Sequence, residues 1–294
     1  MTNEPKHHHY VPRFYLRRFT DDKKQLWVFD KSTGKIFPTT CENIAGENQF
    51  YWNEELNEQG HDPLTLEKQF ADLEGEAAAI TNDWFRQFSR NKKLIIPKIN
   101  REIMSLYLAT QLLRTAEARN RIVEFSKISN PGYDAENDAR QLHIALIWDT
   151  KLVESMCKRI KSCIWMFGLN ETATPFLTSD HPVLIKNFEN TQWLSGPVVY
   201  EPGMYIVFPL TPQLIMYAKD HKHWKGAKIF KDSITPVTFD QHMVQHENSG
   251  QVGMSNRFIF SNENNFDFAK EFLTDNETFK DPKRSRFINK PRGD

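Results

Sequence analysis

Three things are scarce in this sequence of 294 residues: cysteine, a surplus of charge of one sign, and long apolar runs. The three cysteines are odd in number and lack CxxC spacing, which argues against a disulfide framework and a cysteine zinc cluster. Lysine plus arginine equals aspartate plus glutamate at 38 each, so no bulk positive field draws the chain to nucleic acid or to an anionic membrane. No run approaches the roughly 18 apolar residues of a membrane span, and the N-terminal residues contain no apolar signal core. We therefore expect a cytoplasmic protein without membrane contact.

Several catalytic signatures are also missing. The chain has no glycine-rich phosphate loop, no dinucleotide-binding fingerprint and no Gly-x-Ser-x-Gly elbow, which disfavours nucleotide-driven motors, dehydrogenases and α/β-hydrolases. His242 and His246 have the spacing of a helical metal pair, but Met243 stands where a zinc protease needs glutamate. Hydrophobic residues make up 39% of the chain and aromatic residues 13%, which is typical of a folded protein.

Residues 7–19, here called the N-terminal block, concentrate three histidines, two tyrosines and three arginines. Pro12 suits the first turn of a helix, and apolar residues recur every four positions around it. We therefore predict a buried helix rather than a loose tail. His8, His9 and Tyr10 would precede the start of that helix, where free N–H groups favour an anion such as a phosphate.

The apolar pattern after this block predicts a hairpin and then a helical region. Residues 25–29 and 35–37 flank a Lys-Ser-Thr-Gly turn, as in a short β-hairpin. Apolar positions then step by three or four over about 64–88, 99–125 and 135–161. Each of these three stretches predicts a long amphipathic helix.

Past residue 161 the chain consists of short β-like runs punctuated by proline. The expected strands cover residues 163–167, 176–178, 183–185, 205–208, 214–217 and 257–260, with one more helix at 239–246. We predict a single α+β domain over residues 1–294. Its parts are an N-terminal helix and hairpin (1–63), a helical middle of three long helices (64–161) and a mostly antiparallel C-terminal sheet (162–294).

A second polar cluster, here called the Ser-Asp block, occupies residues 176–183 with the sequence Phe-Leu-Thr-Ser-Asp-His-Pro-Val. Together with the opening His-His-Tyr-Val-Pro of residues 8–12, it resembles an uncharacterised bacterial family of proteins of about this length. Members of that family open with His-His-Tyr-x-Pro-x-x-Tyr-Leu-x-x-Phe and carry Thr-Ser-Asp-x-Pro-Val in the second half. One difference is His181, at a position where asparagine is more often expected. The resemblance implies that both blocks belong to one fold, and it brings no assigned activity.

Two interpretations are open for each block. Ser179 and Asp180 follow an apolar run, and polar residues at a strand end are held by a rigid scaffold, where sites are usually built. The alternative is a turn in which Asp180 bonds backbone N–H groups ahead of Pro182. His8 and His9 are either ligands or acid/base groups, or histidines with no chemical role. We predict that the chain brings the two blocks together in one cleft.

Charged side chains on the first two long helices complete the candidate site. Glu67 and Glu74 are seven residues apart, so they project on one side of their helix and could bind Mg²⁺ or Mn²⁺ together with Asp180 and a histidine. Arg114 could grip a phosphate with its fork; solvated charges and interhelical ion pairs are the alternatives for these helices. The substrate-binding candidates are Tyr10, Arg13, Arg17, Gln111, Arg114 and Ser179.

These residues predict a metal-dependent phosphodiester hydrolase, a nuclease or nucleotide phosphodiesterase, with His8, His9 and Asp180 as catalytic residues. The bacterial setting of the family points to defence against phage. The alternative is a non-catalytic module that recognises a nucleic-acid or nucleotide phosphate. Residues 280–292 carry six basic side chains against one acid, so this tail either holds a nucleic-acid backbone or is a solvated terminus.

Overall fold

The fold is α+β in a computed structural model that describes residues 7–90, 93–187, 193–194 and 199–287. The α-helices are α1 (Arg13–Leu16), α2 (Glu54–Glu58), α3 (Thr65–Phe88), α4 (Lys98–Leu113), α5 (Ala116–Ser129), α6 (Ala139–Trp148), α7 (Thr150–Ser162), α8 (Gln241–Met254) and α9 (Asp267–Asp275). Three 3-10 helices are η1 (Arg17–Phe19), η2 (Lys225–Phe230) and η3 (Glu277–Lys280). Within the described parts of the chain, every helix is too short or too polar to cross a bilayer.

In the part of the chain that the structure describes, the strands form three antiparallel sheets. They are β1 (His7–His9), β2 (Leu26–Asp30), β3 (Lys35–Thr39), β4 (Gly46–Asn48), β5 (Ile164–Leu169), β6 (Thr178–Ser179), β7 (Leu184–Lys186), β8 (Trp193–Leu194), β9 (Tyr205–Thr211), β10 (Leu214–Lys219) and β11 (Phe258–Ser261). One sheet has the order β5-β10-β9-β7-β8, a second has the order β3-β2-β11-β6, and β1 pairs with β4. The predicted hairpin is confirmed, and Gly34 makes its turn at φ +72. The hairpin shares a sheet with the late strands β6 and β11.

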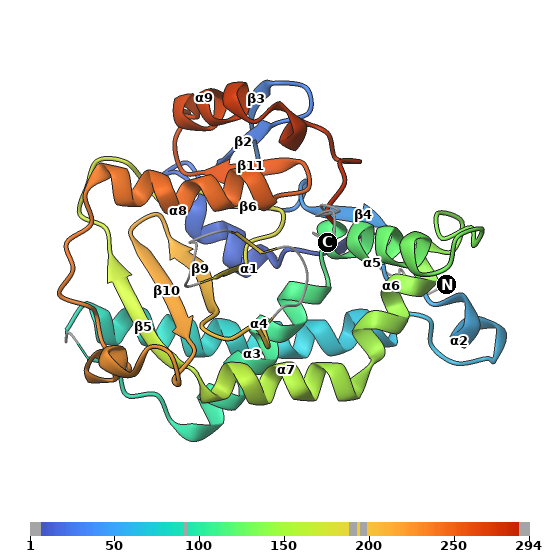
Figure 1. Ribbon diagram of the computed structural model, residues 1–294, viewed down its shortest axis with the longest axis horizontal. Helices are drawn as coiled ribbons and strands as arrows, with labels where there is room; N and C mark the ends of the chain where they lie inside the picture. The colour runs from blue at the N-terminus through green and yellow to red at the C-terminus, as the bar shows by residue number, and fades with distance from the viewer. Residues whose placement is uncertain (1–6, 91–92, 188–192, 195–198, 288–294) are drawn as a thin grey trace, which may run out of the picture.

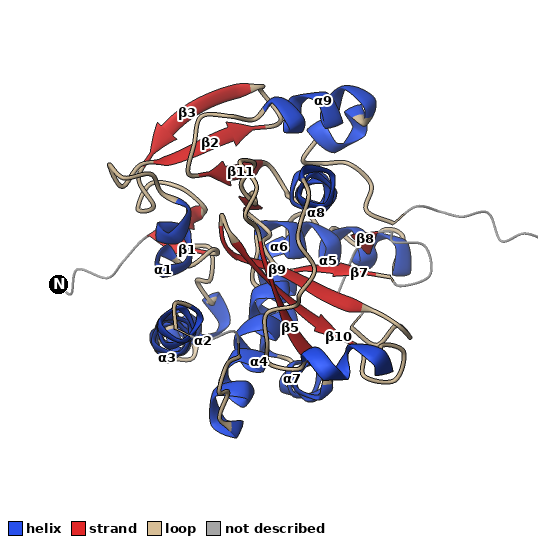
Figure 2. Cartoon of the chain, turned by 90° about the vertical axis from the view of Figure 1, so that its left-hand side faces the viewer, coloured by secondary structure: helices blue, strands red, loops and turns tan. Residues whose placement is uncertain are grey.

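The long helices α3, α4 and α7 lie on one side of the larger sheet, and α8 lies between the two larger sheets. In Figure 1, α3, α4 and α7 run below β5 and β10, while α8 passes between β10 and β11. Figure 2 shows α8 end-on in the same position, and α8 contacts both β6 and β7. One hydrophobic cluster joins Leu16, Trp84, Leu112, Trp165 and Phe260, so a continuous core connects all three parts of the sequence.

The helical middle differs from the prediction of three long helices, because two of the three are broken. The stretch 99–125 is split into α4 and α5 where the Thr115 side chain accepts a hydrogen bond from the Ala118 N–H. The stretch 135–161 is split into α6 and α7 where Asp149 accepts from the Leu152 N–H. Both residues are N-caps, which start a new helix in a new direction while the apolar spacing continues. Apolar period alone does not reveal such breaks.

The N-terminal block is buried, as predicted, but its secondary structure is not one helix. His7–His9 is strand β1, paired with β4, and only Arg13–Leu16 is α-helical before η1. His8 and His9 therefore lie in a strand, and the helix start that was expected to bind an anion does not follow them directly. The helix is only four residues long because Leu16 passes straight into a 3-10 turn.

The two polar blocks meet in the core through Tyr15. Its hydroxyl donates to the carbonyl oxygen of Pro209 at 2.7 Å and lies 2.6 Å from Oγ1 of Thr178. Because Tyr15 has a single hydroxyl hydrogen, Thr178 is the donor in the second bond. Both side chains are almost completely buried, so this junction fastens the N-terminal block to β6 and is closed to solvent.

Candidate functional site

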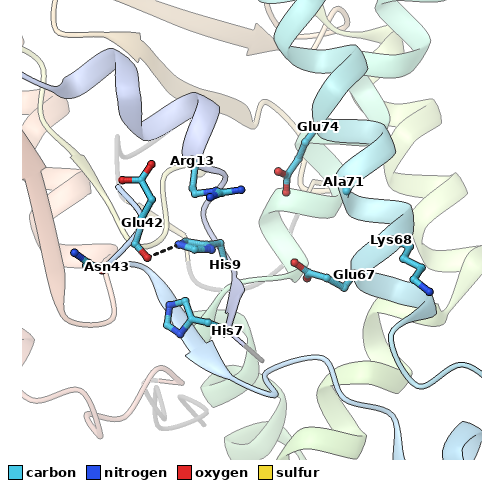
Figure 3. A pocket seen from close by; sticks show the side chains of 9 residues that line it. All are labelled: His7, His9, Arg13, Glu42, Asn43, Glu67, Lys68, Ala71 and Glu74. Atoms are coloured by element: carbon cyan, nitrogen blue, oxygen red, sulfur yellow. Dashed lines mark hydrogen bonds between the residues drawn. The ribbon is translucent and has the colours of Figure 1, made fainter. Parts of the chain in front are cut away.

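A solvent-open pocket of about 710 Å³ lies between β1, the start of α1 and the outer side of α3. Its lining residues are His7, His9, Arg13, Glu42, Asn43, Glu67, Lys68, Ala71 and Glu74. Figure 3 shows the carboxylates of Glu67 and Glu74 reaching from α3 toward Arg13 and His9. Nearly all of these side chains are polar, which is unusual for a drug-sized ligand site and suits a charged one.

Strand alternation determines which histidines reach this pocket. In β1 the outer residues His7 and His9 keep some exposure, whereas His8 is fully buried. The Nδ1 atom of His8 accepts a hydrogen bond from the Tyr51 N–H at 3.0 Å, and its ring stacks on that of Tyr51. Of the two predicted catalytic histidines, His9 therefore lines the pocket and His8 belongs to the core.

His9 is held as a neutral imidazole. Its Nε2 lies 3.2 Å from the backbone oxygen of Glu42, and because a carbonyl oxygen only accepts, Nε2 carries the hydrogen. Burial, with the charges of His7 and Arg13, lowers the pKa of His9 to about 4. At neutral pH the other ring nitrogen, Nδ1, consequently has a lone pair that can accept a proton.

Glu67 and Glu74 face the pocket from the same side of α3, as their seven-residue spacing predicts, but their environments differ. Burial raises the pKa of Glu67 to about 7, and the charge of Glu74 adds to this shift while Arg114 and Arg13 oppose it. The Oε2 atom of Glu67 is buried and has no hydrogen-bond partner among the described residues. Glu74 is instead paired with Arg114 at 2.7 Å. Burial thus favours the protonated form of Glu67, whereas the carboxyl group of Glu74 is held in place by Arg114.

Arg114 does not line this pocket but binds one of its lining residues, Glu74, and is therefore not available to a substrate. The residue is 2% exposed, and its guanidinium donates to Glu74 and, at 2.6 Å, to the backbone oxygen of His9. The guanidinium also lies 4.2 Å from the ring centroid of Phe70. Gln111 is fully buried as well and donates to the backbone oxygen of Tyr10. Both predicted substrate-binding residues therefore tie the N-terminal block to α4.

The remaining arginine candidates are exposed. Arg13 lines the pocket, where its charge contributes to the low pKa of His9. Arg17 pairs with Glu42 at 3.1 Å on the outside and lines a neighbouring depression instead. Only Arg13 is therefore positioned to meet a ligand in this pocket.

Asp180 and Ser179 belong to a different, buried network. The two carboxylate oxygens of Asp180 accept hydrogen bonds of 2.7–2.8 Å from the backbone N–H groups of Asn256, Arg257 and Phe258. Ser179 donates to Gln251 at 2.7 Å. Burial raises the pKa of Asp180 to about 6, although the three N–H donors oppose the shift. These bonds fix the backbone of a distant segment at the start of β11, and they are not the local turn ahead of Pro182 that was considered as the alternative.

The donors predicted for a divalent metal are not assembled in one place. Asp180 does not line the pocket, Glu74 is committed to Arg114, and Glu67 is partly protonated. Within the described ranges, no group of three or more His, Cys, Asp or Glu side chains is arranged to hold a metal ion. The residues in the pocket therefore do not fit a resident Mg²⁺ or Mn²⁺.

The basic tail is partly buried rather than solvated. Arg286 forms a bidentate pair with Glu117, with both distances 3.0 Å, and Arg284 reaches the same carboxylate at 3.3 Å. Glu117 is fully buried and also lies 3.3 Å from Arg121. These arginines cannot hold a nucleic-acid backbone while they are so engaged, and residues 288–294 lie outside the described part of the chain.

Glu117, Arg121, Arg284 and Arg286 form a buried charge cluster that also includes Lys31 and His181. Sequence reasoning did not predict this cluster. Lys31 donates to the backbone oxygens of Val252 and Ser255. Its pKa is lowered to about 7, first by burial and then by the charge of Arg284, while Asp180 and Glu117 oppose the shift. His181 lies 2.7 Å from Oγ1 of Thr115. Nothing in the local spacing marks these residues, because they come from separate elements and meet only in three dimensions.

The fold and pocket together define an α+β protein with a polar pocket beside β1. The chain belongs to the family described as protein of unknown function (DUF4238), whose model matches residues 7–265. That match covers both polar blocks and all of the pocket, and it ends before the C-terminal arginines. No curated protein and no solved structure matches the chain.

Proposed function

We propose that the pocket between β1, α1 and α3 is the active site of a phosphodiester hydrolase, a nuclease or nucleotide phosphodiesterase, that works by general acid–base catalysis. The observation that carries the proposal is Glu67. Its buried Oε2 has no partner among the described residues, and its pKa of about 7 is suited to proton transfer at neutral pH. A glutamate with only a structural role would be hydrogen-bonded or solvated.

The pocket supplies a complementary base and a charge for the substrate. His9 is neutral and accepts a proton from the attacking water as the water oxygen bonds to phosphorus. Glu67 delivers its proton to the leaving oxygen as the bond between phosphorus and that oxygen breaks. Arg13 binds the non-bridging phosphate oxygens through its guanidinium fork. The products are a phosphomonoester and an alcohol, and the proton taken by His9 returns to Glu67 through water.

Glu74 is the residue of this site that an ion pair with Arg114 fixes in place. The ion pair between Glu74 and Arg114 holds α3 against β1, because the same guanidinium binds the backbone oxygen of His9. Glu74 also keeps a negative charge beside Glu67, which helps to hold the proton there. We assign Glu74 and Arg114 as positioning residues.

A non-catalytic nucleotide or nucleic-acid sensor is the second candidate. It is favoured by the basic side chains that line the opening, His7, Arg13 and Lys68, of which Lys68 is also paired with Asp62. In that case the same ligands would bind with similar affinity and remain intact.

The test is hydrolysis of DNA, RNA and cyclic nucleotides by the full chain, compared with Glu67→Gln. The matched control is Glu76→Gln, an exposed glutamate on the same helix. We expect Glu67→Gln to lower kcat about 10²- to 10⁴-fold and Glu76→Gln to leave it unchanged. Wild-type kcat should fall as the pH rises above about 7, because Glu67 must be protonated to act as the acid.

Two results would contradict the catalytic proposal. Binding without turnover for every phosphodiester would favour the sensor. Turnover that needs Mg²⁺ or Mn²⁺ and is abolished by a chelator would contradict the metal-free acid–base mechanism.

A further inference from the structure

A second cavity adjoins the pocket between β1, α1 and α3. It has a volume of about 600 Å³ and is here called the side pocket; its lining residues are Arg17, Thr20, Lys24, Thr40, Cys41 and Glu42. Glu42 lines both cavities, so the two meet at this residue. In Figure 3, Glu42 lies on the far side of His9 from Glu67. The side pocket therefore continues the first pocket on the side away from Glu67.

Arg13 and Arg17 give each cavity one guanidinium. The two residues are four apart on continuous helical backbone, and the Arg17 N–H donates to the backbone oxygen of Arg13. This bond closes one helical turn, so both side chains project from the same side of the helix, about 5.4 Å apart along its axis. Arginine binds a phosphate through its planar fork. The helix thus offers one phosphate position in each cavity.

The cations of the side pocket are accessible to a ligand. Arg17 pairs with Glu42 at 3.1 Å, but the two side chains are 60% and 48% exposed, and such exposed ion pairs are weakly held. Lys24 is exposed, and no carboxylate is paired with it among the residues that the structure describes. Its backbone is fixed, because its N–H donates to the backbone oxygen of Asp21 while Oδ1 of Asp21 accepts from the N–H groups on either side of Lys24.

The shape of the site favours a single strand over a duplex. His9 and Glu67 are both partly buried, so a phosphodiester has to enter the first pocket in order to reach them. A single strand bends into such a cavity, whereas a duplex keeps its phosphates on a stiff rod. Basic and acidic residues are also equal in number, so no bulk positive field attracts a duplex.

We propose that the two cavities bind successive phosphates of a single-stranded nucleic acid, the scissile phosphate at Arg13 and its neighbour at Arg17 and Lys24. The proposal rests on the proposed function, because that function identifies the first pocket as the one that holds the scissile phosphate. It selects the nuclease from the two activities named there.

Glu42 opposes strand binding in this arrangement. Its carboxylate and the neighbouring phosphate compete for the guanidinium of Arg17, and the two negative groups repel each other. A bound strand therefore displaces Glu42 from Arg17. A cyclic nucleotide has a single phosphate and occupies the first pocket alone.

The experiment measures binding of a fluorescein-labelled single strand of about eight nucleotides to the full chain, by fluorescence anisotropy at several salt concentrations. Every sample contains Glu67→Gln so that the strand stays intact. We expect Lys24→Ala to weaken binding severalfold and to lower the slope of log Kd against log salt by about 0.7, the value for one phosphate contact on a single strand. Lys23→Ala is the matched control, because Lys23 is exposed and adjacent in sequence but does not line the side pocket. This pattern with a deoxyribose or a ribose strand supports the proposal, and the tighter of the two identifies the sugar.

Glu42→Gln gives a second test with the opposite sign. It frees Arg17 and removes a negative charge, so it should tighten binding of the strand severalfold. The contact of Glu42 with His9 is made by its backbone oxygen, which the replacement keeps. A glutamate with only a structural role would give no such gain.

Three results would overturn the proposal: equal salt slopes for Lys24→Ala and Lys23→Ala, no gain in affinity with Glu42→Gln, or tighter binding of a duplex than of a single strand of the same length. The assay is independent of turnover, so it separates the proposal from the proposed function. The expected binding pattern in a chain that hydrolyses nothing would contradict the catalysis alone. Hydrolysis of cyclic nucleotides by a chain whose strand binding does not depend on Lys24 would contradict the second phosphate position alone.

Discussion

Replacement of Asp180 by alanine is the most informative single change, because it separates a structural carboxylate from a catalytic one. In the fold, Asp180 is fully buried and accepts three backbone N–H bonds at the turn before β11. The positive charge of Lys31, in the same cluster, favours the charged form of Asp180. Alanine would leave three buried N–H donors without acceptors, and Lys31 would keep Glu117 but lose Asp180 as a negative neighbour.

The expected cost follows from those losses. An unsatisfied buried donor costs about 1–3 kcal/mol, and Asp180→Ala leaves three of them. Part of this loss in the free energy of unfolding is offset, because the alanine variant has no carboxylate to desolvate. The raised pKa of Asp180 indicates that this desolvation is costly in the wild type. We therefore expect Asp180→Ala to lower the free energy of unfolding by about 3–5 kcal/mol. Asp180→Asn keeps one carbonyl oxygen and should cost about 1–3 kcal/mol.

Urea unfolding followed by tryptophan fluorescence measures both values, with Asp22→Ala as the control because Asp22 is exposed. Surface replacements of this kind change stability by about 0.5 kcal/mol or less. If Asp180→Ala unfolds within about 1 kcal/mol of the wild type, the structural assignment is wrong. If it also removes hydrolytic activity at unchanged stability, Asp180 is catalytic.

Three further predictions concern stability. Because the pKa of Glu67 is raised in the folded chain, Glu67 stays protonated between pH about 4.3 and 7, where the unfolded chain has released that proton. The contribution of Glu67 to the free energy of unfolding is therefore lost as the pH rises through this window. Glu67→Gln should therefore be more stable than the wild type by about 2 kcal/mol at pH 8, after a discount for partial exposure, and no more stable at pH 4, as measured by urea unfolding at both values. Arg286→Ala should cost about 2–4 kcal/mol because it weakens the pairing of buried Glu117, and thermal melting that shows no loss would indicate that the C-terminal segment is not docked. Tyr15→Phe should cost about 1–3 kcal/mol in urea unfolding by leaving Thr178 without its acceptor, and a neutral change would count against the junction between the two blocks.

The sequence predicted element types well where each element buries one regular apolar pattern. The hairpin at residues 25–37, the helix at 64–88 and the late strands follow from alternation or from a period of 3.6, because one face of each packs on the core. The same signal could not detect the breaks at Thr115 and Asp149. A cap residue in the middle of a continuous apolar stripe changes the direction of the chain without changing the stripe.

The site was only partly predictable, because residue type says what a side chain can do and not which groups surround it. Helical spacing predicted that Glu67 and Glu74 project on one side of their helix, and both line one pocket together with His9. Arg114 and Asp180 have side chains that are as suited to a functional role as those of Glu67 and His9. Both are already hydrogen-bonded to distant segments, Arg114 to the backbone oxygen of His9 and Asp180 to the backbone N–H of Arg257. Those partners could be identified only after the chain was folded.

The antiparallel pairing of β2 with β11 constrains how the protein is made. Asp30 lies opposite Phe258, so more than 200 residues separate the paired strands along the chain. A ribosome that adds about 5–20 residues per second needs roughly 10–45 seconds to deliver the second strand. During that time one edge of β2 has no partner strand, and such an edge is a template for pairing with other chains. The risk of aggregation is thus set by translation speed and by whatever shields this edge on the ribosome, before the stability of the finished fold has any effect.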